Sequence, residues 1–225
     1  MKTKLILLAL IAFLSTSVTF SQDPDKGKAA FAILGGVNFQ NLNGKNYNGD
    51  KLENEMIIGY HAGVNVLLPL APQFYFQPGL LFSTKGATNS YGSLTGTFKL
   101  SYVELPLNFV YRAPLGNGKI MVGFGPYVGY AIGGKAELVL GDLSAEEDIV
   151  FQNTIETGDP LLTAYFKPLD VGGNIFVAYE MAGGIFLQLN TQLGLVKINP
   201  QDMRISDDKS SVKNTGFGVS LGYRF

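Results

Sequence analysis

Apolar and polar residues alternate with a period of two along most of the chain, which is the pattern of strands with two different faces. Eight segments show this alternation and are expected to be strands: residues 31–41, 55–69, 73–88, 94–112, 119–136, 167–180, 184–199 and 214–225. No segment has the period of a convincing amphipathic helix. The pattern therefore predicts an all-β fold with eight antiparallel strands.

The connections between the expected strands alternate in length. Short connections lie near 69–73, 113–119 and 181–184, and longer ones at roughly 42–54, 89–93, 137–166 and 200–213, of which the second is long only by comparison. An up-and-down meander with all its tight turns at one end gives this alternation. Bacterial outer-membrane barrels have it too, with short periplasmic turns and longer outer loops.

The two faces of the expected strands differ in kind. On 119–136, for example, Ile120, Val122 and Phe124 oppose Gly123 and Gly125. Lys and Glu are scarce in the strands, and small residues with amides suit a narrow interior better than a solvated surface. We therefore expect an eight-stranded transmembrane β-barrel with its apolar face in lipid and a lumen filled by side chains. A soluble lipocalin-like barrel is the rival architecture.

The interior face carries polar side chains that predict a lumen polar network. Its members are His61, Glu104, Arg112, Tyr127, Asn174, Glu180, Gln188, Asn190 and Arg224, and the same face carries Asn65, Gln77, Lys85, Asn108, Asp170 and Gln192. Counting from the turns places Glu104 beside Tyr127 and Asn174 opposite Asn190. Three charged residues gather at the periplasmic end: Arg112, Glu180 and Arg224. Buried charges must be paired or hydrated, so we interpret the set as a stabilising plug. A narrow substrate path is the alternative.

Aromatic residues cluster on the outward face near the short-turn end, as in an interfacial girdle. They are Phe74, Phe76, Phe109, Tyr111, Tyr179, Tyr223 and Phe225. Three prolines, Pro78, Pro106 and Pro126, fall at nearly one level on neighbouring expected strands. Because proline has no N–H and a closed barrel has no free edge, we expect a row of ladder defects or bulges there.

The first residues have the pattern of a secretory signal. Lys2 and Lys4 precede an apolar run from Leu5 to Leu14, and cleavage is expected after Ser21. The sequence thus divides into a signal peptide, 1–21, and a barrel domain, 22–225. Without Lys2 and Lys4, 15 basic residues stand against 18 acidic ones. With no basic stripe and no tryptophan, nucleic acid is not an expected partner.

Four segments in order resemble the PorT-like outer-membrane β-barrel family, which is common in Bacteroidota. They are "LSYVELPLNFVYR" (100–112), "GFGPYVGYAIGGK" (123–135), "DVGGNIFVAYEM" (170–181) and "VSLGYRF" (219–225). The resemblance implies an eight-stranded barrel of the cell envelope, mostly without assigned activity, and a founding member tied to type IX secretion. Phe225 is similar to the C-terminal aromatic residue that the outer-membrane assembly machinery recognises. The partners expected from this location are outer-membrane lipid and that machinery.

Little in the chain points to catalysis. His61 is the only histidine and cysteine is absent, so no metal, cofactor or catalytic residue is predicted. A Ser–His–carboxylate lipid hydrolase remains an alternative, as does an accessory role in secretion. The connection 137–166 is acidic, and we interpret it as a solvated loop that could contact an extracellular or envelope partner. Carboxylates can bind Ca²⁺, but their spacing here fits no EF-hand. Its carboxylates are Glu137, Asp142, Glu146, Glu147, Asp148, Glu156 and Asp159.

Overall fold

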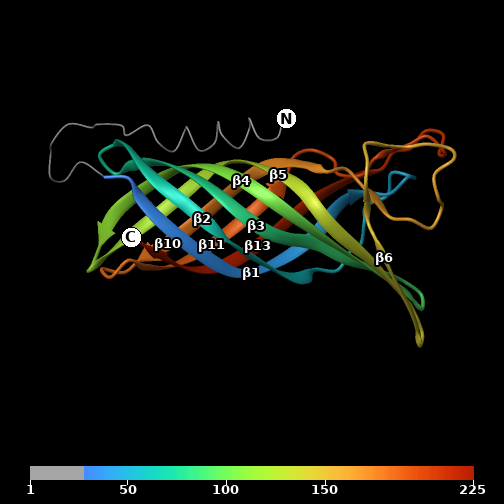
Figure 1. The fold of residues 1–225 in the computed structure, drawn as a ribbon, viewed down its shortest axis with the longest axis horizontal. Coiled ribbons are helices and arrows are strands. Elements are labelled where there is room, and N and C mark those ends of the chain that lie inside the picture. The colour runs from blue at the N-terminus through green and yellow to red at the C-terminus, as the bar shows by residue number, and fades with distance from the viewer. Residues whose placement is uncertain (1–27) are drawn as a thin grey trace, which may run out of the picture.

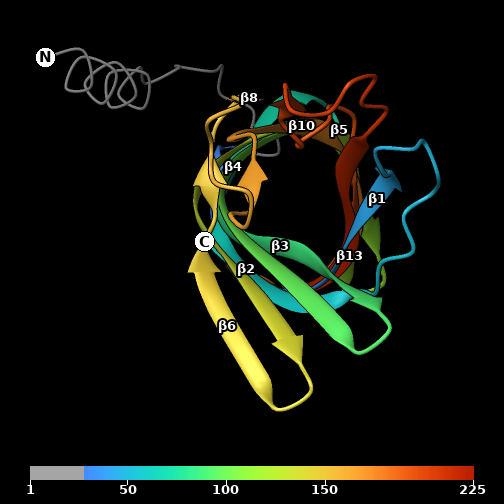
Figure 2. The same cartoon turned by 90° about the vertical axis from the view of Figure 1, so that its right-hand side faces the viewer.

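The computed structural model describes residues 28–225, and eight of its strands close into a barrel (Figures 1 and 2). The ring strands are β1 (Ala30–Lys45), β2 (Ile57–Ala71), β3 (Phe74–Tyr91), β4 (Leu94–Leu115), β5 (Gly118–Leu140), β10 (Leu169–Glu180), β11 (Ile185–Gly194) and β13 (Ser211–Arg224). Neighbours in the ring pair antiparallel, and β13 closes onto β1. The expected all-β, eight-stranded antiparallel up-and-down barrel is confirmed. The proposed signal peptide, 1–21, lies outside the described residues.

The alternation sorts side chains as expected. Ile58, Tyr60 and Phe124 are 60% or more exposed on the outer wall, whereas inward neighbours such as His61 are buried. An outer wall of exposed aliphatic and aromatic residues around a polar interior is the reverse of a soluble barrel. Among residues 28–225, no helix is long and apolar enough to span a membrane.

The strand bounds differ from expectation mainly at the loop end. Strand β3 ends at Tyr91 and β4 begins at Leu94, so the second outer connection is a two-residue turn, not a loop over 89–93. Strand β11 ends at Gly194, before the expected 199. Strand pairing continues past the barrel wall on one side, where β4 and β5 have 22 and 23 residues, while β10 and β11 have 12 and 10.

The three prolines coincide with gaps in the ladder, as expected. At Pro106 the pairing between β3 and β4 stops at Pro78↔Leu107 and resumes at Leu81↔Glu104. The same kind of gap occurs in the β2–β3 ladder at Pro78 of β3 and in the β4–β5 ladder at Pro126 of β5. The register is the same on both sides of each gap. Ladder defects are therefore confirmed, but they are missing pairs rather than bulges. The register shifts lie elsewhere, at Pro69/Ala71 and Ser101/Tyr102.

Two loops fold together over the loop end of the barrel. We call residues 149–168 and 195–210 the outer cap. They contain the short strands β7 (Val150–Phe151), β8 (Thr154–Ile155), β9 (Tyr165–Phe166) and β12 (Gln201–Asp202), whereas β6 (Leu143–Asp148) precedes the cap and pairs with β5. Strand β12 pairs with β8, and β7 with β9, both parallel. The cap buries Ile149, Phe166 and Ile198 against the barrel residues Leu100 and Tyr102, which closes the outer mouth with an apolar layer.

Candidate functional site

The lumen holds the largest set of buried polar side chains in the described chain, and glycines make room for it. A Cβ at Gly123 would lie 2.2 Å from the Phe176 ring, and one at Gly222 would lie 2.2 Å from the Phe186 ring. Each ring covers the glycine that it pairs with on the neighbouring strand, Phe176 over Gly123 of β5 and Phe186 over Gly222 of β13. The Gly-rich inward rows are therefore explained by packing in a narrow barrel.

A cluster of three ions lies beneath the outer cap, and we call it the outer ion cluster. Lys85 Nζ is 2.8 Å from Glu104 Oε1 and 3.0 Å from Asp170 Oδ2, and the three side chains are at most 1% exposed. Tyr127 donates its hydroxyl to Asp170, and Lys85 Nζ lies 4.3 Å from the centre of the Tyr127 ring. Gln192 donates to Glu104 from across the lumen. One ammonium is thus shared by two carboxylates, with neutral donors satisfying part of the remaining charge.

A mirror arrangement lies at the short-turn end, and we call it the periplasmic ion cluster. Glu180 accepts from Arg224 Nε at 2.9 Å and forms an ion pair with Arg112 through its other oxygen. Here one carboxylate is shared by two guanidinium groups. Arg224 lies over the Phe186 ring and Arg112 over the Tyr75 ring. Arg112, Glu180 and Arg224 thus lie together at the short-turn end, as the sequence predicts.

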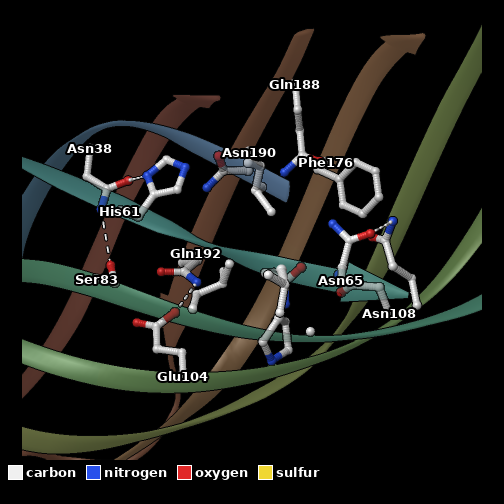
Figure 3. Close-up of a pocket in the computed structure, with 17 residues that line it drawn as sticks. Asn38, His61, Asn65, Ser83, Glu104, Asn108, Phe176, Gln188, Asn190 and Gln192 are labelled. Carbon is white, nitrogen blue, oxygen red and sulfur yellow. Dashed lines mark hydrogen bonds between the residues drawn. The ribbon is translucent and has the colours of Figure 1, made fainter. Parts of the chain in front are cut away.

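His61 belongs to a chain of neutral hydrogen bonds, part of which Figure 3 shows. It lies between the two ion clusters, because it pairs with Ser83 near Lys85, while Asn65, further along β2, accepts from Arg224. The Nδ1 atom of His61 is 2.6 Å from Asn38 Oδ1, and its Nε2 is 2.7 Å from Ser220 Oγ. Asn38 in turn donates to Ser83 Oγ. With Asn38 accepting through its oxygen, Nδ1 carries the proton and Nε2 accepts from Ser220. A hydroxyl, an imidazole and an orienting amide therefore stand in the order of a catalytic triad.

The space beside this chain is small and polar. A cavity of about 50 Å³ is lined by amides from facing strands, among them Asn108 and Asn190 (Figure 3). Asn174 lines it too. Asn108 Oδ1, Asn190 Oδ1 and Asn174 Nδ2 are buried and have no protein hydrogen-bond partner. Two acceptors and a donor without partners are what water satisfies, and this volume holds about three or four water molecules. It has no room for a lipid ester, and Ser220, which is fully buried, is not among its lining residues.

The structure places every residue of the predicted network on the inward face, but it changes several neighbours. Glu104 pairs across the ladder with Gly129, and Tyr127 with Pro106, so the expected Glu104–Tyr127 neighbourhood is wrong by two positions. Likewise, Asn190 pairs with Phe176, not with Asn174. A shift of two residues keeps each side chain inside and changes only what it touches. Gln188 lines the cavity, as do Asn174 and Asn190.

Sequence reasoning missed the partners that complete the network. They are Asn38, Ser83, Tyr102, Asn214 and Ser220. Alternation did assign Ser220 to an inward row, but nothing in the sequence indicated that β13 would bring its hydroxyl to His61 of β2. Lys85 and Asp170 were expected inside without a partner, and the structure shows that they pair with each other.

The predicted aromatic girdle lies on the outward face at the short-turn end. Phe74 packs against Tyr111 and Phe76 against Phe109 in tilted pairs, with ring centres 5.3 and 5.8 Å apart. Tyr223 meets Phe225 edge-on, with their ring centres 4.9 Å apart. Tyr179 donates its hydroxyl to the Leu115 carbonyl. Apolar rings with polar tips that reach backbone are typical of a membrane interface.

The outer cap has its own electrostatic anchor. Arg204 forms a bidentate pair with Asp202 and also donates to the backbone carbonyls of Asp159 and Pro160. The Arg204 guanidinium holds the pKa of the Asp202 carboxyl below its usual range, because its hydrogen bonds favour the charged form. The two loops of the cap are thereby joined. No group of three or more acidic, histidine or cysteine side chains within residues 28–225 is arranged to hold a metal ion.

The family profile of the outer membrane protein beta-barrel domain matches residues 20–199. The chain belongs to this family. Membership and the closed eight-stranded barrel together place the protein in the bacterial outer membrane. No curated protein sequence matches the chain.

Solved structures with a similar arrangement of strands share little sequence with this family member. One is Ail, the attachment invasion locus protein of Yersinia pestis, with 12% identity, coverage of 88% of this chain and 100% of that chain, and a TM-score of 0.41. Another is Neisserial surface protein A, with 10% identity, the same coverages and a TM-score of 0.44.

Proposed function

We propose that this protein is a non-catalytic outer-membrane barrel with a closed lumen, and that it works through its outer surface as an interaction protein. One observation carries the proposal: two long outer loops fold together into the outer cap, which contributes the buried residues Ile149, Phe166 and Ile198. Loops that serve only to connect strands have no need of such a core. The partner contact is assigned to 137–166, and nucleic acid is not a partner.

A barrel in the outer membrane must be exported from the cytoplasm and must contact lipid. We assign residues 1–21 to a cleaved export signal and 22–225 to the barrel, whose outward face contacts outer-membrane lipid. The assembly machinery would recognise the C-terminal strand through Phe225, whose ring is 69% exposed. Its backbone N–H is bonded to Phe31 at the closing seam of the barrel.

A deletion strain tests the proposal against an accessory role in type IX-like secretion, the role that the PorT-like motifs suggest. Secreted proteins and lipid A are profiled together in the deletion strain, in the complemented strain, and in one whose chain has 141–160 replaced by a Gly/Ser linker. We expect unchanged export and unchanged lipid A in all three. The proposal would be overturned if the deletion strain lost export and the variant with the Gly/Ser linker restored it, because the barrel and not its outer loop would then carry the function. A heat-modifiable gel shift shows that each chain has folded.

A membrane-embedded hydrolase is the second candidate, favoured by the Ser220–His61–Asn38 chain of hydrogen bonds. Against it stand a fully buried Ser220 and a cavity of about 50 Å³. A fluorophosphonate probe labels an activated serine, so the test is labelling of the folded barrel, with Ser220→Ala as control. We expect no labelling above the control. Labelling that His61→Ala and Ser220→Ala both abolish would establish the hydrolase instead.

A further inference from the structure

Four strands form one sheet beyond the barrel wall, which we call the outer extension: residues 86–99 and 135–148. Crossing the hydrocarbon core takes about 9–11 tilted residues, and β4 and β5 have 22 and 23. The excess carries the β3–β4 and β5–β6 hairpins past the rest of the barrel, where both project freely (Figures 1 and 2). This element is built beyond what membrane crossing requires.

The last strand of the outer extension has an open edge. Within residues 28–225, strand β6 pairs with β5 alone, and all six of its residues are exposed. The odd-numbered residues bond to β5, since Leu143 and Leu140 flank the two-residue turn and Ile149 N–H donates to Gly134 O. The alternate residues, Ser144 and Glu146 among them, therefore direct their N–H and C=O groups away from the sheet. An edge of this kind accepts another strand.

One face of the outer extension is apolar at its tip. Leu94, Leu140 and Leu143 lie opposite one another in a row across three strands, with exposures of 42, 53 and 73%. Leu138, 42% exposed, adjoins the row beside Ala145. Exposed leucines in a contiguous group on a soluble surface mark an interaction site. We call these four residues the leucine row.

The charge at this edge is negative. Lys99 pairs with Glu137 and Lys135 with Glu146, so both lysines of the outer extension are engaged. Asp142, Glu147 and Asp148 have no lysine or arginine partner among the described residues. The edge therefore offers backbone groups, apolar surface and about three uncompensated carboxylates to whatever binds it.

We propose that β6 is a docking edge for an extended, basic segment of another protein, which adds as a strand and covers the leucine row with its apolar side chains. This inference rests on the proposed function and names the partner's chemistry. A second copy of the chain is a poor occupant. Antiparallel pairing centred on Ala145 would set Asp142 against Asp148 of the other copy, and parallel pairing would set each acid beside itself. Like charges directly opposite destabilise a strand pair.

The test uses the full barrel in a non-ionic detergent and a short labelled peptide of alternating lysine and valine. We expect saturable binding by fluorescence anisotropy, weakened by salt, and no binding of the glutamate–valine counterpart. Ser144→Pro removes one outward N–H without touching the β5–β6 ladder, and we expect about a tenfold loss. Leu143→Ser should weaken binding comparably, whereas Val139→Ser, on the opposite face, is the matched control.

Three results would overturn the inference: no binding of the lysine peptide, equal binding of the glutamate peptide, or unchanged affinity in Ser144→Pro. Concentration-dependent dimers that Ser144→Pro abolishes would give the edge to a second copy. A refolded variant is recognised by its heat-modifiable gel shift, so a folding failure is not mistaken for lost binding. Because the peptide experiment is independent of export and lipid A, its failure and that of the proposed function are distinguishable.

Discussion

The two ion clusters of the lumen are built as opposites. In the outer cluster the single cation Lys85 lies between Glu104 and Asp170, whereas in the periplasmic cluster the single anion Glu180 lies between Arg112 and Arg224. The outer cluster is at most 1% exposed beneath an apolar cap. The periplasmic cluster, at 3–14%, reaches the short-turn end. Equal numbers of charges are thus held in a dry site and in a wetter one.

This difference indicates which ion of each cluster contributes most to the stability of the barrel. A buried charge left without its counter-ion is costly because nothing replaces the lost solvation. Near water, the remaining groups can be partly rehydrated. We therefore expect the central ion of each cluster to dominate its stability, and the outer one to dominate more. The formal charge of the outer cluster is −1 and that of the periplasmic cluster is +1, so the two cancel only when the lumen is taken as a whole.

Lys85→Met should have the largest effect, since it leaves Glu104 and Asp170 buried side by side without a cation. We expect a loss of about 3–5 kcal/mol in the free energy of unfolding. Because the chain has no tryptophan, urea unfolding in phosphatidylcholine vesicles is followed by circular dichroism and gel mobility. Adding Glu104→Gln and Asp170→Asn should recover most of the loss. A triple variant as unstable as the single one would show that packing, not charge, is responsible.

Glu180→Gln makes the equivalent change at the wetter end. Two arginines then face each other without an anion, and we expect a loss of about 2 kcal/mol, smaller than for Lys85→Met. Arg112→Met is the control, because Arg224 keeps its pair with Glu180; it should cost about 1 kcal/mol or less. If Glu180→Gln were as damaging as Lys85→Met, the distinction between a dry and a wet cluster would fail.

The sequence predicts the two faces of each strand well, because period-two alternation is a local property. It places His61, Glu104 and Arg224 inside without any knowledge of their neighbours. It also predicts where the ladder fails at Pro106, since a missing N–H is written in the residue itself. What depends on one residue's chemistry could be derived from the sequence.

Contacts could not be derived in the same way. The β4–β5 turn at Gly116–Asn117, together with the irregularity at Ser101/Tyr102, sets which residues face each other, and counting from a misplaced turn put Glu104 beside Tyr127. Lys85 and Asp170 lie on β3 and β10, which are not neighbours in the ring. Their meeting depends on the diameter of the closed barrel, which no stretch of sequence encodes locally.

Ser220→Ala removes a neutral hydrogen bond in the same lumen, and its effect on stability can be compared with the effects of the ionic variants. It removes the hydroxyl that His61 Nε2 accepts from, in a fully buried position. We expect a loss of about 1–2 kcal/mol, because a buried acceptor is left without its donor. The same vesicle assay measures it. A loss as large as that of Lys85→Met would mean that the His61 chain, rather than the outer ion cluster, is the main polar support of the barrel.

The salt dependence of these stability losses is the smallest expected effect, but it distinguishes the two clusters most clearly. Screening acts on charges that solvent and ions can approach and hardly on those buried under an apolar layer. Raising the NaCl concentration should therefore reduce the loss caused by Glu180→Gln by a few tenths of a kcal/mol and leave the loss caused by Lys85→Met unchanged. Unfolding of both variants and the wild type at low and high salt measures this. Equal salt sensitivity would show that ions reach Lys85, and hence that the outer cap does not seal the lumen.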